Sequence, residues 1–590
     1  MLPSVLKDIG VGFLANGFNE IYTDYTLQRN LPKAFIWEGS DSSKVISYRN
    51  ETYIEGKSFG LTHDNYVIEH RLWSRLNKLI ATKNDFNPIL MNTAFTDNAG
   101  IAQGQYQAAL KWNDEYAYPK FVISNLSEFA KVFIAKYIDG LEIIRGDLTS
   151  PWDINYQGEA KLFKKYRWAQ HNILSAEKLS SLNTLLNKEN VSFTNEIDNV
   201  YESMLNFSAH GSGLEFGYGS PEDNRLAVEY REDYVQSAYL DTKGLLEKGI
   251  YRLTKSEESF EGPGIVVFNP LSWYHDQAIK VNFPKEGNLN YSIKDLATNT
   301  TLPSAWSGHS LIFIADSLPS FGYKKYRLFD AASAETKPSD FVTGLDLSIE
   351  NEYYKIEIDK RSQNIKSILS KTNSKDIIDH SNKLGFNIPL VEKFQIGENF
   401  SSIDSVKSDY LINHNTPVYE ELLLTRKNHL FEETKYTLYK NINRIDISQK
   451  LNLSTLSQTS TIEEYAVALP VNINPANYKV ELLGGFADPS KDIMRGNQSD
   501  AFSIRRVVAI YSDMESFYIA LKDSRVVKFI RSEDGHKTLL ISIYNNFPES
   551  WNRNEINEGY FDISYSIMHD DNTIDYSLAN RFGWEVNTEP

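Results

Sequence analysis

The sequence predicts a multidomain chain in which an α/β region is followed by an α-helical region and then by antiparallel β-domains. Three patterns along the 590 residues support this. Strand and helix patterns alternate up to about residue 157, apolar residues then recur every three or four positions, and short strand patterns follow after about residue 256. We therefore expect domains at residues 1–157, 158–255, 256–330 and 341–590, with 330–340 as a linker.

The first region alternates β-branched or aromatic runs with amphipathic stretches, which indicates a parallel α/β layer. Functional groups in such layers lie at the carboxyl ends of strands. This rule points to Asp97 and Asn98, which follow one strand pattern, and to Asp147, which follows another. The expected strands are "VGFLAN" (11–16), "KVISYR" (44–49), "PILMNTAF" (88–95), "KFVISN" (120–125) and "LEIIRG" (141–146), and the expected helices are 65–83 and 126–138.

Residues 158–255 carry the helical spacing with two breaks, which predicts a bundle of three antiparallel helices. His210 lies in the second break, among glycines. Residues 256–330 favour a small β-domain, and residues 341–590 favour large antiparallel sandwiches.

Composition excludes several classes of function. The net charge is 61 − 78 = −17, which argues against a nucleic-acid partner. The chain contains no cysteine, so any metal would have to be held by histidine and carboxylate groups. No apolar run is long enough to span a membrane, and the amino-terminal stretch lacks a basic region and carries Asp8. From these features we expect a soluble protein, cytoplasmic by default.

Six motifs in the same order resemble glycoside hydrolase family 38, the α-mannosidases. The segment 31–56 is similar to the family's strand–loop–strand "F-W-W-E-G-x-D-G-S-x-V", and "AHGSG" stands where many members have "E-H-T-W-G". The other matching segments are "FTDNAGI" (95–101), "IIRGDLTSPW" (143–152), "GIVVFNPLSW" (264–273) and "YYKIEIDKRSQNIKSI" (353–368).

The resemblance implies a partial parallel α/β barrel, a helical bundle and a large galactose-mutarotase-like β-sandwich. It also implies hydrolysis of α-linked sugars, usually mannose, with retention of configuration. A retaining mechanism needs two carboxyl groups about 5 Å apart, one of them a nucleophile and the other a general acid. Family members also use zinc, held by a histidine and an aspartate of an H-x-D strand, by the nucleophile, and by a histidine at the bundle turn.

Several residues take candidate roles from this resemblance. Asp153 best matches the general acid, and Asp147 is the second choice. Asp97 and Asn98 resemble residues that bind sugar hydroxyls, although a turn-capping role fits them equally well. Trp37 is a candidate for stacking on a sugar, with buried packing as the alternative.

His210 matches the bundle-turn zinc ligand, with a histidine hydrogen-bonded at that turn as the alternative. In the family the other ligands and the nucleophile precede the segment that here reads "LPSVLKDIGVGFL". We therefore expect a member lacking the amino-terminal part of the catalytic domain, which by itself would not bind zinc tightly. A missing amino-terminal segment or a second copy of the chain is an expected partner. The alternative is an inactive remnant or a carbohydrate-binding protein.

One further histidine has a literal H-x-D pattern, His569 with Asp571. It stands at the end of a strand pattern in the last sandwich. We expect a solvated hairpin turn there rather than a metal site.

Overall fold

The computed structural model divides the chain into two compact units, Met1–Trp152 with Leu482–Ser499, and Asp153–Glu481 with Asp500–Pro590. None of the described helices is long and apolar enough to cross a membrane. The described residues are 2–17, 31–50, 55–61, 64–81, 86–92, 103–148, 159–187, 192–209, 220–255, 262–284, 291–330, 348–359, 362, 364–393, 401–402, 410–455, 463–494, 500–531, 537–545 and 559–590.

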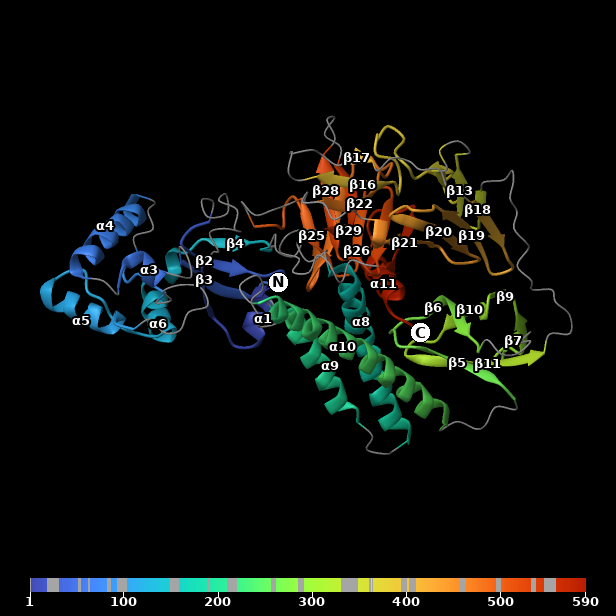
Figure 1. The fold of residues 1–590 in the computed structure, drawn as a ribbon, viewed down its shortest axis with the longest axis horizontal. Coiled ribbons are helices and arrows are strands. Elements are labelled where there is room, and N and C mark those ends of the chain that lie inside the picture. The colour runs from blue at the N-terminus through green and yellow to red at the C-terminus, as the bar shows by residue number, and fades with distance from the viewer. Residues whose placement is uncertain are drawn as a thin grey trace. The chain divides into compact units, whose positions relative to one another are not determined.

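The amino-terminal part of the first unit, blue and cyan in Figure 1, consists of a small sheet with helices beside it. A segment from far along the chain, 482–499, belongs to it, although its sequence pattern groups it with the sandwich region. The elements are α1 (Leu2–Asp8), β1 (Phe13–Gly17), β2 (Ala34–Glu38), β3 (Lys44–Asn50), α3 (Glu55–Phe59), α4 (Asn65–Ala81), α5 (Gln105–Glu115), α6 (Leu126–Tyr137), the 3₁₀ turn η1 (Ile138–Gly140), β4 (Ile143–Arg145) and β24 (Gly485–Ala487).

The sheet of this unit has the order β1-β3-β2-β4 and is mixed. Strand β1 is parallel to β3 and β2 is parallel to β4, but β2 and β3 form an antiparallel hairpin. The expectation of a wholly parallel layer is therefore wrong, because the loop between β2 and β3 is too short for a parallel crossover. Within the described residues the four strands form an open sheet, and the partial barrel stays a prediction.

Two predicted strands do not form in the described residues, at 88–92 and 120–125. Their backbone donors bond to side chains instead of to neighbouring strands. The Leu90 N–H donates to the Tyr48 hydroxyl (3.1 Å), and the Phe121 N–H donates to Asn113 Oδ1 (2.8 Å). Each segment also begins at or beside a proline, which removes one ladder donor.

Aromatic packing forms the core on one face of this sheet. Tyr48 of β3 contacts Phe129 and Phe133 of α6 edge-to-face, with ring centroids 5.2 and 5.3 Å apart. These two residues lie four apart on α6, so they share one face of the helix. Asn125 caps α6 by accepting a hydrogen bond from the Glu128 N–H (3.0 Å).

The second unit begins with three long helices, the teal and green ribbons of Figure 1: α8 (Ala160–Asn187), α9 (Thr194–Ser208) and α10 (Pro221–Lys255). They pack on a buried cluster that includes Ile173 and Val200. A buried ion pair connects α10 to the residue before α8, since Arg231 donates two hydrogen bonds to Glu159 at 3.1 and 2.5 Å. The stretch that contains the helical spacing thus forms helices as predicted.

The rest of the unit consists of antiparallel sheets, as the sequence predicts. The small β-domain holds β5 (Gly264–Asn269), β6 (His275–Asn282), β7 (Tyr291–Asp295), β8 (Thr300–Leu302), β9 (Ser304–Ser307), β10 (Ser310–Leu318) and β11 (Gly322–Asp330), in sheets β6-β10-β9 and β5-β11-β7-β8. A four-stranded sheet then holds β12 (Ser348–Glu350), β13 (Tyr354–Ile358), β14 (Ile365–Ser370) and β15 (Lys375–Asp376).

A six-stranded and a nine-stranded sheet make the large sandwich, with orders β17-β16-β22-β29-β28-β25 and β18-β19-β20-β21-β30-β27-β26-β23-β24. Rings such as Tyr478 and Phe529 meet between them, with centroids 5.1 Å apart. The remaining elements are β16 (Pro389–Lys393), β17 (Ser401–Ser402), β18 (Tyr410–Asn415), β19 (Tyr419–Thr425), β20 (Phe431–Tyr439), β21 (Ile445–Asn452), η4 (Leu453–Thr455), β22 (Glu463–Leu469), β23 (Asn477–Leu482), β25 (Ala501–Ser503), β26 (Val507–Tyr511), β27 (Ser516–Leu521), β28 (Val526–Arg531), β29 (Lys537–Asn545), β30 (Tyr560–Asp570) and α11 (Tyr576–Asn587).

One buried guanidinium connects the helices to the sandwich. Arg167 of α8 is 4% exposed and donates to four backbone carbonyls. The acceptors are Ile504 (3.3 Å), Arg505 (2.9 Å), Leu521 (3.1 Å) and Lys522 (3.2 Å). Two of these carbonyls lie just before β26 and two lie at the end of β27, so a single side chain fixes both places against α8.

We expect Arg167→Met to lower the free energy of unfolding of the second unit by about 3–5 kcal/mol, because it leaves four buried carbonyls without a donor. Urea unfolding followed by circular dichroism measures the loss. The exposed Arg225→Met on α10 is the control, with an expected change of about 0.5 kcal/mol or less. Equal unfolding midpoints for the two variants would show that Arg167 does not join the two parts.

Candidate functional site

The loop after β4 is fixed by backbone pairing with the distant segment 488–494. The Asp147 N–H donates to the Asp492 carbonyl (2.7 Å), and the Met494 N–H donates to the Asp147 carbonyl (2.9 Å). These bonds form an isolated parallel bridge between Asp147 and Ile493. The Met494 side chain is buried beside Ile144 of β4. A residue expected at a catalytic edge is thus held by chain more than 340 positions away.

Glycine is required at the position before Asp147. Gly146 has φ +121°, and a Cβ built there would lie 2.7 Å from the Met494 nitrogen and 3.0 Å from the Ile493 carbonyl carbon. The backbone conformation and the close approach therefore both exclude a larger residue. The Gly146 carbonyl accepts a hydrogen bond from the Trp37 indole N–H (2.9 Å).

Trp37 lies in the core of the first unit. It is 2% exposed and packs with Leu31, Phe35 and Ile144. Buried packing, the alternative given for this residue, accounts for its position. Its connection to the candidate site is the hydrogen bond to Gly146. Asp97, Asn98, Asp153 and His210 lie outside the described residues, so the structure brings together only Trp37 and Asp147, through Gly146.

A buried polar cluster that the sequence analysis missed lies where β3 ends. Glu55 Oε2 accepts hydrogen bonds from the Asn50 side chain and from the Asn92 N–H (2.9 Å). Lys33 lies with its ammonium 5.2 Å from the centre of the Tyr48 ring. Lys33 and Glu55 are only 5% and 3% exposed. The sequence feature that indicates this cluster is the group of polar residues directly after a strand, in "NETYIEG" (50–56). From sequence alone, this stretch is assigned to a strand–loop–strand motif.

Burial shifts both ionisable groups of this cluster toward their neutral forms. It lowers the pKa of Lys33 to about 8, with Glu55 partly opposing the shift. It raises the pKa of Glu55, and hydrogen bonds from Asn92 and Asn50 and the charge of Lys33 oppose that change. Perturbed groups of this kind gather at functional sites, although structural ion pairs produce them too. Here the cluster fixes Asn92, five residues before Asp97.

Comparisons with known proteins identify solved structures that have a similar fold. No protein-family model and no curated protein sequence matches the chain. An α-mannosidase from Enterococcus faecalis V583 superposes with a TM-score of 0.73 at 13% identity, covering 99% of this chain and 74% of that chain. A glycosyl hydrolase family 38 protein from Enterococcus faecalis gives 0.70 at 12% identity, covering 99% and 73%. The chain has the fold of the family 38 glycoside hydrolases. The predicted resemblance is thereby confirmed at the level of the fold.

The family 38 glycoside hydrolases use zinc. Among the described residues of this chain, no group of three or more histidine, aspartate or glutamate side chains is placed to bind one metal ion. His210, the residue that the resemblance assigns to zinc, is outside these residues. A metal site in the family 38 fold of this chain therefore stays a prediction.

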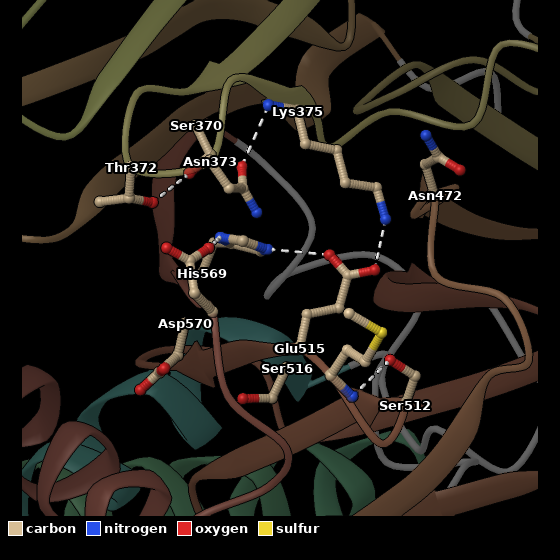
Figure 2. A network of polar contacts seen from close by, with 12 residues as sticks. Ser370, Thr372, Asn373, Lys375, Asn472, Ser512, Glu515, Ser516, His569 and Asp570 are labelled. Atoms are coloured by element: carbon tan, nitrogen blue, oxygen red, sulfur yellow. Dashed lines mark hydrogen bonds and ion pairs between the residues drawn. The ribbon is translucent and has the colours of Figure 1, made fainter.

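A second polar network surrounds Glu515 and His569 in the second unit (Figure 2). Glu515 accepts from Lys375 and forms a hydrogen bond with His569 Nε2 (3.2 Å), while the His569 N–H donates to the Tyr354 hydroxyl (2.9 Å). His569 is 4% exposed, so the expectation of a solvated turn is wrong for this residue. Asp571 Oδ1 lies 3.6 Å from His569 Nδ1. The network ties three separate segments together, which indicates a structural role.

Gly146→Ala should lower the free energy of unfolding of the first unit by about 3 kcal/mol, because the added methyl group clashes with backbone and the φ angle becomes strained. Fluorescence of the buried Trp37 during urea unfolding reports the change. Gly140→Ala is a matched control, since nothing lies within 4 Å of a Cβ at that position. If both variants unfold at the same urea concentration, the pairing with segment 488–494 does not limit the stability of this unit.

The stability of the first unit should rise with pH between about 8 and 10.5, because the folded unit binds fewer protons there than the unfolded chain. The rise should total about 3 kcal/mol, and Lys33→Met should remove it. The Lys33→Met variant also carries Glu55→Gln, so that the buried Glu55 carboxylate is not left without the positive charge of Lys33. Unfolding curves at several pH values measure the slope. The exposed Lys7→Met should keep the parent slope, and loss of the slope in that control would contradict the assignment.

Proposed function

We propose that these 590 residues function as part of a glycosidase of the α-mannosidase type, which acts on α-linked mannose-type glycans with retention of configuration and whose nucleophile is not among them. The observation that carries the proposal is the correspondence of fold with an α-mannosidase over 99% of the chain. The order of six sequence motifs along the chain supports it independently. Fold alone does not specify chemistry, so the roles of individual residues rest on the motifs.

The proposed general acid is Asp153, with Asp147 as the second choice. Either carboxyl group would protonate the leaving glycosidic oxygen. The backbone bonds of Asp147 to segment 488–494 favour a rigid loop at this position, and rigid placement is what general acid catalysis requires. Asp97 and Asn98 would bind sugar hydroxyls. Trp37 would act from the core, by holding the Gly146 carbonyl, instead of stacking on the substrate.

His210 is the proposed zinc ligand. When bound, zinc would polarise and orient sugar hydroxyls as a Lewis acid. The resemblance finds no counterpart among these 590 residues of the other three ligands, one of which is the nucleophile. We therefore assign no catalytic step to the metal here.

The second candidate function is a protein that binds carbohydrate without hydrolysing it. The specific observation in its favour is that His210 alone matches the four zinc ligands of the family. Both candidates predict binding of α-mannosides, and they differ in turnover.

Hydrolysis of an aryl α-mannoside by the 590-residue chain should be at background, because no residue matches the nucleophile. A longer polypeptide, in which these residues are joined to the amino-terminal segment that the resemblance implies, should hydrolyse the same substrate, with kcat reduced about 10²–10⁴-fold in Asp153→Asn. Release of the aryl group measures both rates. Asp139→Asn, on the turn η1, is the control.

Background rates for both polypeptides would favour the binding protein. Zinc-dependent turnover by the 590-residue chain itself would mean that these residues contain a nucleophile the motifs do not reveal.

A further inference from the structure

The second unit contains a cavity of about 540 Å³ between α8, α10, β5 and the segment that follows α11. Small-molecule sites in proteins have volumes of about 300–1,000 Å³. All of the lining residues belong to this one unit. None of them is a residue that the motifs assign to catalysis or zinc binding.

The floor of the cavity is apolar and well ordered by packing. Leu179 of α8 and Phe268 of β5 are 1% and 2% exposed and pack in one cluster with Leu246 of α10 at its edge. Helices α8 and α10 approach closely here: a Cβ built on Gly249 of α10 would lie 3.0 Å from the Leu179 Cβ of α8. The floor is therefore set by helix packing and does not depend on a loop.

Aromatic rings form the walls. Trp168 of α8 and Tyr239 of α10 meet with centroids 4.9 Å apart and an interplanar angle of 63°. Tyr251, three turns further along α10, is 64% exposed. Aromatic rings with polar tips offer a flat apolar face together with a hydrogen-bonding group. Rings at two places along one cavity suit a ligand with more than one flat unit.

Charged side chains stand at the rim. Lys243 and Glu247 are exposed, lie one helical turn apart on α10, and form no ion pair with another described residue. Glu589 contributes from the opposite side, where its backbone N–H donates to Asn172 Oδ1 (3.0 Å). Asn172 of α8 is fully buried, so it holds this terminal segment beside the cavity. The rim thus offers both donors and carboxylate acceptors.

We propose that this cavity is a binding site for a neutral oligosaccharide of two or three sugar rings. Sugar rings present apolar C–H faces to aromatic walls and many hydroxyls, which donate to carboxylates and accept from an ammonium group. An anionic ligand such as a phosphate fits poorly, because two carboxylates at the rim outnumber one lysine. The assignment concerns binding only and does not depend on hydrolysis.

Titration calorimetry of the full chain with α-linked mannotriose, and with maltotriose as a second neutral probe, tests the site. At least one of the two should bind, and Tyr251→Ala should weaken binding by about tenfold, the effect of losing one stacked ring. Glu247→Gln should weaken it by a smaller factor. Both residues are exposed, so neither variant endangers the fold. Asp241→Asn, exposed on the same helix and away from the cavity, should bind as the parent does.

Three results would overturn the site. The first is no heat with either trisaccharide at millimolar concentration, and the second is binding that Tyr251→Ala leaves unchanged. The third is binding of tetramethylammonium in place of sugar, which would assign the aromatic walls to a cation. Asp153→Asn distinguishes this proposal from the catalytic one, because it should lower turnover by the longer polypeptide described above and leave the cavity's affinity unchanged.

Discussion

The geometry of the candidate site depends on backbone pairing between two segments that lie far apart in the sequence. Asp147 follows the short strand β4, and its backbone bonds to Asp492 and Met494, together with the Trp37 bond to the Gly146 carbonyl, hold its loop. Gly146 makes this approach possible, since any Cβ there would meet backbone atoms. The first unit is consequently completed by residues 482–499, which come from between two stretches of the second unit. A change in that segment would disturb Asp147 without altering any residue of the α/β region.

Buried arginines play the corresponding role in the second unit. Arg167 supplies four donors to backbone carbonyls, and Arg231 and Arg506 each form a buried ion pair with a glutamate, Glu159 and Glu481 respectively. Burying such charges costs free energy that their partners offset only when the geometry is good. An apolar contact would tolerate many orientations, whereas a planar guanidinium with fixed donors tolerates few. We attribute the defined packing of α8 on the sandwich, and hence the shape of the cavity beside α8, to this constraint.

The sequence predicts the regular elements well where a single period dominates. The helices at 65–83 and 126–138 and the strand at 44–49 appear as α4, α6 and β3. The strands expected at 88–95 and 120–125 do not form in their described parts, because backbone N–H groups there donate to the side chains of Tyr48, Glu55 and Asn113. The apolar content of these segments predicts a strand but does not reveal these hydrogen bonds. The motifs identified the right fold. They could not reveal the role of segment 488–494 or the burial of His569, since both depend on contacts between residues distant in sequence.

The buried cluster at the end of β3 lowers the stability of the first unit but fixes the position of neighbouring segments. A buried lysine and a buried glutamate, each shifted toward its neutral form, destabilise the unit relative to apolar residues of similar size. Stability therefore gives no reason for the pair. Position does, because Glu55 accepts from both Asn50 and Asn92 and so ties the end of β3 to the stretch that leads toward Asp97 and Asn98. An apolar replacement would remove the acceptor and release that stretch. The polar cluster therefore holds Asn92 in place, five residues before the Asp97 of the proposed site.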